Sequence, residues 1–397
     1  MSVRIVVAGG GITGLAAAFT LRQEARRRGI PVDLIVLEAG AEAGGHARTI
    51  VEDGFVVERG PNGFLDRGVD TMVLIEQLGL APSLVEANPH ARRRFILQSG
   101  ELRQVPESPA ALLSSKTLSR RAKLRLLREP WADPPPAGED ETVFGFAERR
   151  LGREVADAFV DTAVAGITAG DSRALSVRSQ FPVLTEWERE YGSLLKALLK
   201  RKSGGRPRLM SLEGGLGTLT RAMAARLNGA LRLNNRIDRV ERIDAGWRLH
   251  LATGSAIVAD RFVCALPSHA AAGLAQGFDR DLAEALAAIP YADLSVVALA
   301  YPSSAVGRRL DGYGYLVTRH ENLSTLGVLW ESSIFPNRAP DGHVLLRAIL
   351  GGTRRPTVSA LDDRSVADLA VQEAAGVLGL GGRPTRHWVV RWPSAIA

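Results

Sequence analysis

The chain has 397 residues, of which 46% are hydrophobic and 23% are charged, a composition typical of a soluble protein with two or three domains. No apolar run approaches the roughly 18 residues of a membrane-spanning helix, and no signal peptide precedes the first predicted strand. The formal net charge of +7 is compatible with nucleic acid, an anionic lipid surface or an acidic small molecule. Because no nucleic-acid motif with interleaved aromatic residues is present, the lipid and the small molecule are favoured.

The cysteine and histidine residues indicate no disulfide, nucleophile or metal site. Cys264 is the only cysteine, so an internal disulfide is excluded, in keeping with a reducing cytoplasm. It lies in the apolar run 262–267, which predicts a buried core residue rather than a nucleophile. The seven histidines show no metal-ligand spacing, and no metal site is expected.

The first forty residues carry the most informative local pattern. Apolar strands are predicted at Val3–Ala8 and Val32–Leu37, with an alanine-rich helix at 15–28 between them. The second strand ends on Glu38. This strand–turn–helix–strand order is typical of a nucleotide-binding α/β unit, whereas an ordinary βαβ unit with a glycine turn is the less favoured interpretation.

The turn after the first strand has the pattern G-x-G-x-x-G. Gly9 permits the tight turn, Gly11 lets the backbone approach a pyrophosphate, and Gly14 lets the helix pack closely on the strand. The helix N-terminus then offers N–H groups and a positive dipole to the phosphates. Glu38 lies 24 residues beyond Gly14, where a carboxylate accepts hydrogen bonds from a ribose hydroxyl.

A second glycine pair follows the second strand. Gly44 and Gly45 mark another turn, and Arg48 lies at the start of a predicted strand pair at 47–52 and 54–60. A hairpin bounded by glycines explains the pattern on its own. The alternative interpretation is that Gly44, Gly45 and Arg48 contact the phosphates and ring system of the cofactor.

The middle of the chain is predicted to be mainly helical. A helix at 69–80 precedes two strands around the Ser99-Gly100 turn, and residues 108–202 are mostly helical, with one helix at 112–130 and another at 185–202. The first of these two carries five basic residues between Lys116 and Arg125. Such a helix suits an anionic membrane surface, but it equally suits a solvated helix face.

The remaining part alternates strands and helices. A break at 203–207 is followed by the segment 211–227, a glycine-rich turn that leads into a helix, and by strand-rich sequence at 231–266. The final third is predicted to contain four strands and two helices. The strands are at 295–301, 313–318, 324–330 and 343–352, and the helices are at 281–289 and 365–379.

Taken together, these motifs resemble the flavin-dependent protoporphyrinogen oxidases, which belong to the amine-oxidase-like flavoproteins. The glycine motifs suit any flavoprotein of that superfamily, whereas GITAGDSRALSVRSQFP at 166–182 and FPNRAPDGHVLLRAILGG at 335–352 are more specific to the porphyrinogen branch. The resemblance extends from residue 3 to about residue 393. Its other segments are VVAGGGITGLAAA, LEAGAEAGGHARTI, VERGPNGFLDR, RRRFILQSGELRQVPESP, EREYGSLL, LEGGLGTL, YGYLV and LGVLWESSIFPNRAP.

The resemblance implies FAD as the cofactor and assigns residues to it. Gly9, Gly11 and Gly14 would hold the pyrophosphate and Glu38 the adenosine ribose, while Gly45 and Arg48 match the second glycine motif near the flavin. In a separate region, Val240 matches a position whose backbone holds the adenine, although an ordinary strand valine is nearly as good an interpretation.

The resemblance also implies a flat apolar tetrapyrrole with two propionates as the substrate. Arg94 matches the propionate-binding arginine, since a guanidinium fork suits a carboxylate, although by sequence alone it is a surface arginine. Leu316 and Ile349 match apolar positions that sandwich the macrocycle, although by sequence alone they are core strand residues. Gly166 matches a position whose backbone faces the pyrrole N–H groups, and Asn62 matches a polar position near the reacting centre.

The chemistry implied is the six-electron oxidation of protoporphyrinogen IX to protoporphyrin IX in haem biosynthesis. A hydride passes from a ring-bridging carbon to the flavin, and molecular oxygen is reduced to hydrogen peroxide; the cofactor supplies the difficult step. Coproporphyrinogen III is the main rival substrate. Two further interpretations stay open, a non-catalytic truncated remnant and an amine or carotenoid oxidoreductase of the same superfamily.

The sequence departs from this family in two places. His46 replaces the usual residue of the second glycine turn, and the chain stops at Ala397, where relatives continue into a second flavin-binding stretch, so a truncated C-terminus is expected. The expected fold is α/β, a Rossmann-like FAD-binding domain with a mixed-sheet substrate domain and a helical insert. The FAD-binding parts are 1–85 and 204–270, the insert, with membrane association left open, is 86–203, and the substrate domain is 271–397.

The expected partners are the tetrapyrrole and molecular oxygen, with an anionic membrane surface and a homodimer left open and no nucleic acid. The expected location is the cytoplasm, with peripheral attachment to the inner face of the cell membrane as the open alternative.

Overall fold

The computed structural model describes residues 2–115, 117–135, 138, 140–200 and 207–397. The predictions for Lys116, for residues 136, 137 and 139 of the helical insert, and for residues 201–206 therefore lie outside the described residues. The chain divides into two compact units. The first unit comprises Met1–Glu86 and Arg208–Pro290, and the second comprises Ala87–Pro207 and Tyr291–Ala397.

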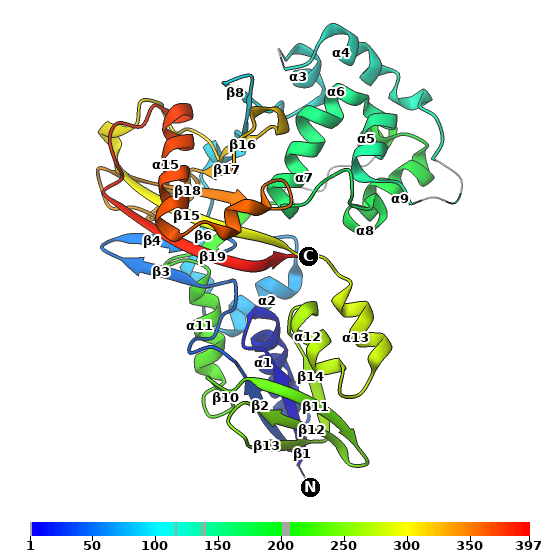
Figure 1. The fold of residues 1–397 in the computed structure, drawn as a ribbon, viewed down its shortest axis with the longest axis vertical. Helices are drawn as coiled ribbons and strands as arrows, with labels where there is room; N and C mark the ends of the chain where they lie inside the picture. The colour runs from blue at the N-terminus through cyan, green and yellow to red at the C-terminus, as the bar shows by residue number, and fades with distance from the viewer. Residues whose placement is uncertain (1, 116, 136–137, 139, 201–206) are drawn as a thin grey trace. The chain divides into compact units, whose positions relative to one another are not determined.

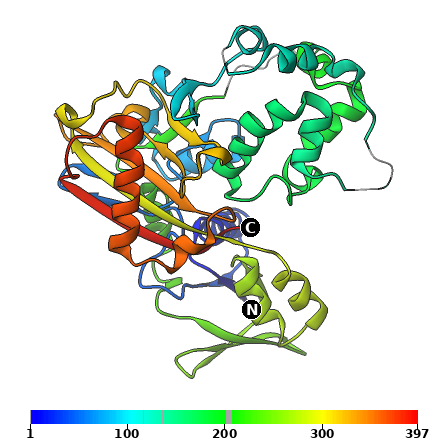
Figure 2. The ribbon, with the colours of Figure 1, turned by 45° about the horizontal axis from the view of Figure 1, so that its top comes forward.

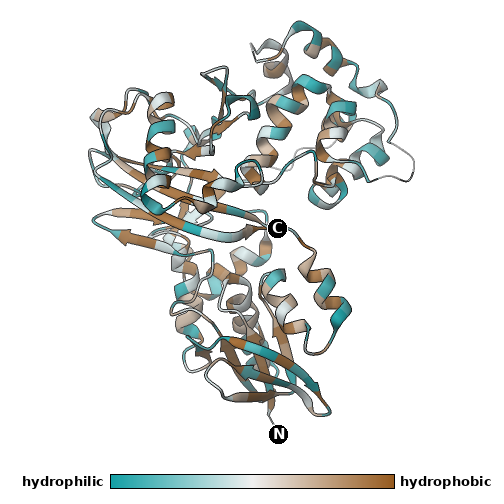
Figure 3. Cartoon of the chain, viewed as in Figure 1, coloured by the Kyte–Doolittle hydropathy of each residue, from teal (hydrophilic) through white to brown (hydrophobic). Residues whose placement is uncertain are grey.

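The first unit is built on a parallel sheet in the order β10-β2-β1-β14. Strand β1 (Val3–Ala8) pairs with β2 (Val32–Leu37) and with β14 (Arg261–Cys264), and β10 (Leu231–Arg232) adds to the far side of β2. Figure 3 shows β1 and β2 in predominantly hydrophobic colours, as expected for strands covered on both faces.

Alternate side chains of β1 enter two different cores. Val7 packs with helix α1 (Ile12–Arg27) and helix α11 (Gly217–Arg226) on one face of the sheet. Val6 packs on the other face with Val240 and its neighbours from a three-stranded antiparallel sheet. The second half of β1, Ile5–Ala8, is apolar because both of its faces are covered, whereas Val3 and Arg4 at its start are exposed. This second sheet is made of β11 (Ile237–Ile243), β12 (Gly246–Leu251) and β13 (Ala256–Ala259).

Shorter elements complete the first unit. They are the hairpin β3 (Thr49–Glu52) and β4 (Phe55–Glu58), the small sheet of β5 (Phe64–Leu65), β6 (Leu84–Glu86) and β9 (Leu209–Leu212), and helices α2 (Val69–Gln77), α12 (Ser268–Ala275) and α13 (Arg280–Ala287).

The second unit is built on a seven-stranded mixed sheet in the order β19-β15-β18-β17-β16-β7-β8. Strands β16 and β7 are parallel, and the other neighbours are antiparallel. Helix α15 (Asp363–Leu378) covers one face and buries Val366 and Ala370 against Leu299 and Leu346 (Figure 1). The strands are β7 (Phe95–Gln98), β8 (Glu101–Gln104), β15 (Ala292–Pro302), β16 (Gly314–Val317), β17 (Thr325–Leu329), β18 (His343–Gly351) and β19 (Arg386–Ile396).

A group of helices lies beside this sheet within the second unit (Figure 2). A π-helical turn at Ala156–Val160 runs directly into α7 (Asp161–Thr168). The other helices of this group are α3 (Pro109–Ser114), α4 (Arg120–Leu127), α5 (Val143–Leu151), α6 (Arg153–Val155), α8 (Val177–Gln180), α9 (Pro182–Tyr191) and α10 (Leu194–Lys200). The short helix α14 (Glu331–Ile334) instead packs against β18.

Three local predictions are wrong. The run 112–130 is not one helix, because the side chain of Ser119 accepts the N–H of Ala122 and begins the new helix α4. The run 185–202 is interrupted at Gly192, whose φ of +67° ends α9 before α10 begins. Cys264 is exposed rather than buried, because it ends β14, the edge strand of the parallel sheet.

Candidate functional site

The turn between β1 and α1 requires glycine at two positions. Gly9 has a φ of +104°, and a Cβ on it would come within 2.8 Å of the Ala265 carbonyl oxygen. A Cβ on Gly14 would come within 1.9 Å of the Gly9 carbonyl oxygen, so only glycine lets α1 start this close to the strand. Gly11 differs, since the nearest heavy atom to its Cβ position is the Gly45 Cα at 3.9 Å.

The N-terminus of α1 is arranged for an anionic ligand. Gly11 is the N-cap residue and provides no side-chain cap, and the first turn of α1 contains no acidic residue. The first N–H groups of this 16-residue helix therefore meet no side-chain acceptor from the cap, and the helix dipole favours negative charge there. The open space at Gly11 leaves room for a diphosphate to approach the backbone.

Glu38 is fixed at the end of β2 beside this turn. One carboxylate oxygen accepts the N–H of Gly10 at 2.7 Å, and the other accepts the N–H of Gly40 at 2.8 Å. The side chain is half-buried. Since each carboxylate oxygen can accept more than one hydrogen bond, Glu38 retains acceptor capacity for a ribose hydroxyl.

The second glycine pair lies against the first glycine turn. The N–H of Gly44 donates to the Gly10 carbonyl at 2.7 Å, and a Cβ on Gly45 would come within 3.1 Å of the Gly11 Cα. The Arg48 Nε donates to the Gly45 carbonyl at 2.9 Å. The structure thus brings the predicted residues Gly9, Gly11, Gly14, Glu38, Gly45 and Arg48 together, and this cradle fits the diphosphate and ribose of a dinucleotide.

Two other predicted residues of the first unit lie in its interior. The Val240 side chain is fully buried in the core shared by the parallel sheet and the β11–β13 sheet, and a Cβ on Gly277 would come within 2.2 Å of the Val240 carbonyl oxygen. Asn62 is buried, and its carbonyl oxygen accepts the Ser211 hydroxyl at 3.0 Å. The roles expected for both residues stay predictions.

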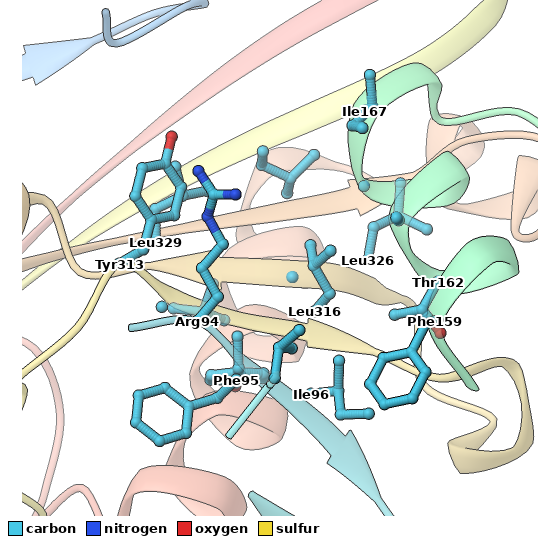
Figure 4. Close-up of a pocket in the computed structure, with 18 residues that line it drawn as sticks. Arg94, Phe95, Ile96, Phe159, Thr162, Ile167, Tyr313, Leu316, Leu326 and Leu329 are labelled. Carbon is cyan, nitrogen blue, oxygen red and sulfur yellow. The ribbon is translucent and has the colours of Figure 1, made fainter. Parts of the chain in front are cut away.

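The second unit contains a cavity of about 410 Å³ between α7 and the large sheet (Figure 4). Its walls are mainly apolar, and of the lining residues that the structure describes, Arg94 alone is charged. The predicted residues Arg94, Gly166, Leu316 and Ile349 all line it. The other lining residues are Phe95, Ile96, Val105, Phe159, Thr162, Ala163, Ile167, Tyr313, Gly314, Tyr315, Leu326, Gly327, Val328 and Leu329.

Arg94 lies at one end of this cavity. Its guanidinium carbon lies 5.3 Å from the centre of the Tyr313 ring, and Figure 4 shows the two side chains together. No carboxylate in the described part of the chain pairs with it. The neighbouring Arg93 instead forms an ion pair of 2.6 Å with Asp311. Of these two consecutive arginines, Arg93 therefore serves the fold, whereas the charge of Arg94 remains available to an anion.

Leu316 is held in place by two glycines. A Cβ on Gly166 of α7 would come within 2.5 Å of a Leu316 methyl carbon, and a Cβ on Gly327 of β17 would come within 2.7 Å of the same carbon. The apolar floor of the cavity therefore depends on the absence of side chains on both sides of Leu316. Gly327 was not among the predicted site residues, although a glycine inside a strand is a signal of close approach.

A buried ionic cluster anchors α7. The carboxylate of Asp161 is fully buried and lies 2.9 Å from a guanidinium nitrogen of Arg319 and 2.7 Å from one of Arg354. The Ser172 hydroxyl also donates to it at 2.5 Å. Because Arg319 follows β16 and Arg354 follows β18, the cluster ties the cavity wall to two strands of the sheet. No local pattern in the sequence indicated it.

The pKa of Asp161 is lowered despite its burial. Desolvation alone would raise it, but the hydrogen bonds from Arg319 and Ser172 and the charge of Arg354 outweigh that cost. A carboxyl whose pKa is lower in the folded state stabilises the fold above its ordinary pKa of about 3.9. This contribution is lost as the pH falls below that value toward the folded-state pKa.

Replacing Asp161 with asparagine is expected to lower the free energy of unfolding at pH 7 by about 3 kcal/mol, because two arginines lose a buried partner. The difference in melting temperature between the wild type and Asp161→Asn should shrink as the pH is lowered below about 4. Thermal unfolding from pH 7 to pH 3 measures it. Asp157→Asn, which removes a partly exposed pair with Arg173, is the control and should cost less than about 1 kcal/mol. A difference for Asp161→Asn that is independent of pH would contradict the assignment.

Comparisons with known proteins agree with this architecture. The family described as "Flavin containing amine oxidoreductase" matches residues 12–397. Human protoporphyrinogen oxidase is 31% identical over 97% of this chain and 86% of its own length, and the Bacillus subtilis (strain 168) coproporphyrinogen III oxidase is 27% identical over 99% and 86%. A solved structure from Exiguobacterium sp. 255-15 has a TM-score of 0.84 at 24% identity, covering 99% of this chain and 87% of its own. The chain therefore belongs to the flavin-containing amine oxidoreductase family, in the group that includes the protoporphyrinogen oxidases.

Proposed function

We propose that this chain oxidises protoporphyrinogen IX to protoporphyrin IX, with FAD as its cofactor and molecular oxygen as the electron acceptor. Six electrons and six protons leave the tetrapyrrole, and three molecules of oxygen become three of hydrogen peroxide. The observation that supports this most is the apolar cavity of the second unit with Arg94 at its end. An apolar macrocycle with carboxylates at one edge matches that distribution of charge.

In this proposal the segments 1–85 and 204–270 bind FAD, while 86–203 and 271–397 face the substrate. The glycine cradle and Glu38 hold the diphosphate and ribose, and Gly45, Arg48 and the Val240 backbone complete the cofactor contacts. When bound, FAD supplies the acceptor for a hydride from a ring-bridging carbon.

The residues around the cavity bind and orient the substrate. Arg94 pairs with a propionate, Leu316 and Ile349 contact the faces of the macrocycle, and Gly166 keeps that wall clear of side-chain atoms. Asn62 is assigned to the reacting centre. The apolar lining excludes water from the ring. Together with Arg94 it holds the substrate in one orientation.

Coproporphyrinogen III is the second candidate substrate, supported by the relationship to the Bacillus subtilis protein. It carries four propionates, which is less compatible with a cavity that has a single charged lining residue among those described. The ratio of kcat/KM for the two substrates decides between them.

The experiment is an absorption spectrum of the purified protein with added FAD, followed by a porphyrin fluorescence assay. Flavin absorption bands, enzyme-dependent growth of protoporphyrin fluorescence and hydrogen peroxide at three molecules per porphyrin are expected. Growth no faster than autoxidation, with flavin bound, would contradict the proposed reaction. A protein that binds no flavin would contradict the cofactor site as well.

A peripheral membrane contact is a further part of the proposal. None of the described helices is long and apolar enough to cross a membrane. However, Leu124, Leu127 and Trp131 are exposed, Trp131 by 81%, beside the exposed Arg120 and Arg121. Apolar side chains flanked by arginines suit an anionic lipid surface.

Replacing Trp131 with glutamate is expected to weaken binding to vesicles that contain phosphatidylglycerol about ten-fold, because an inserting side chain is lost and a like charge is added. Co-sedimentation with such vesicles, compared with phosphatidylcholine alone, measures this. Val69, which is 74% exposed on α2, gives the control Val69→Glu. If the wild type and Trp131→Glu bind these vesicles equally, the proposed membrane contact is wrong.

A further inference from the structure

One face of α7 forms a wall of the cavity. Thr162, Ala163, Gly166 and Ile167 all line it, at the helical spacing that places residues on one side. Thr162 is the only one of the four with a polar side chain. It is 1% exposed, and its hydroxyl has no hydrogen-bond partner in the described chain.

The hydroxyl of Thr162 departs from what helices normally do with threonine. A threonine within a helix usually donates to the carbonyl three or four residues earlier. Thr168 in the same helix does so, with its hydroxyl 2.8 Å from the Val164 carbonyl oxygen. Thr162 instead follows the π-helical turn Ala156–Val160, a deviation that is frequent at functional sites.

An unsatisfied buried hydroxyl destabilises the folded state, so it calls for a compensating role. The cavity beside it supplies one, because a ligand there can provide the missing partner. Figure 4 shows Thr162 next to Phe159, another lining residue, which is only half-buried. Because the hydroxyl oxygen itself is buried, a ligand in the cavity reaches it only if a neighbouring side chain such as Phe159 turns aside.

We propose that Thr162 is a substrate-contact residue whose hydroxyl hydrogen-bonds a ring nitrogen of the bound tetrapyrrole. This inference rests on the proposed function and adds a residue to its site. A porphyrinogen presents four pyrrole N–H donors, whereas the porphyrin retains two N–H groups and gains two imine-type acceptors. A hydroxyl both accepts and donates, so it can remain bonded as the ring nitrogens change character.

The proposal predicts that removing the hydroxyl raises the stability of the protein and lowers its affinity for the tetrapyrrole. Thr162→Val keeps the shape of the side chain and removes the hydroxyl, so the unsatisfied group disappears from the folded protein. We expect Thr162→Val to melt at a higher temperature than the wild type while binding the tetrapyrrole about five-fold more weakly. Thr162→Ser keeps the hydroxyl and is expected to bind within about two-fold of the wild type.

Thr325 provides a matched control. Its hydroxyl is also buried without a partner, but the residue lies on β17 and does not line this cavity. Thr325→Val should therefore raise the melting temperature and leave tetrapyrrole binding unchanged. The four proteins are compared by thermal unfolding, by fluorescence titration with protoporphyrin IX, and by KM and kcat for protoporphyrinogen IX.

The outcomes distinguish the two proposals. If Thr162→Val leaves both the protoporphyrin Kd and the KM unchanged, or if it lowers the melting temperature, Thr162 serves the fold and the inference is overturned. A wild type that binds protoporphyrin IX without oxidising the porphyrinogen overturns the proposed function, and the Kd comparison still decides the role of Thr162. A wild type that neither binds nor oxidises overturns both.

Discussion

Replacing Gly11 with alanine is expected to weaken FAD binding about 100-fold or more while leaving the fold intact. The φ of Gly11 is −73°, which alanine adopts without strain, and the nearest heavy atom to the new Cβ lies 3.9 Å away. The free energy of unfolding of the cofactor-free protein should therefore change by less than about 1 kcal/mol. The methyl group stands where a diphosphate approaches the helix N-terminus, so at least two backbone hydrogen bonds are lost, and affinity falls about 100-fold or more.

The flavin absorbance of the gel-filtered protein and a titration with FAD measure this effect. Gly273→Ala is the matched control, since Gly273 lies in α12 of the same unit with no heavy atom within 4 Å of its Cβ position, and it should bind FAD normally. Gly14→Ala should differ from both and unfold more readily, because its Cβ meets the Gly9 carbonyl. If Gly11→Ala binds FAD as tightly as the wild type does, the diphosphate does not bind against Gly11.

These glycines were predictable because their chemistry is local. Strands β1 and β2 have the predicted bounds, Val3–Ala8 and Val32–Leu37, and the turn between β1 and α1 has the predicted glycine geometry. The apolar pattern of each strand and the spacing of the glycines involve residues that are close together in the sequence. Both features can therefore be recognised before the structure is known. Arg94 and Gly166 are different, because only the family resemblance indicated them, and the structure brings them to one cavity.

Contacts between distant residues could not be predicted. Asp161 meets Arg319 across 158 positions of the sequence, and no periodicity records that pairing. The hydroxyl of Thr162 is buried without a partner just after a π-helical turn, and no propensity indicates either feature. The prediction of one helix at 185–202 was wrong for a related reason. Gly192 has a left-handed backbone conformation, which is visible only once the structure is known.

Replacing Arg94 with alanine is expected to raise the KM for protoporphyrinogen IX about 30-fold, with a smaller change in kcat. The guanidinium lies at the cavity end over Tyr313 and has no carboxylate partner among the described residues, so a substrate propionate is its partner in the proposed complex. A charge-assisted hydrogen-bonded pair of this kind accounts for a change of that size. Stability should change by less than about 1 kcal/mol, because the side chain is exposed.

A neutral substrate gives the most direct test of this contact. Protoporphyrinogen IX dimethyl ester carries no carboxylate, so the wild type and Arg94→Ala should differ far less in KM with the ester than with the free acid. Arg92→Ala, two positions earlier at an exposed site that does not line the cavity, is the control and should behave as the wild type with both. Arg94→Lys should recover part of the affinity, since it keeps the charge and loses the planar fork. If the ester and the acid respond equally to Arg94→Ala, the arginine shapes the cavity instead of pairing with a propionate, and the charge-based account of substrate recognition fails.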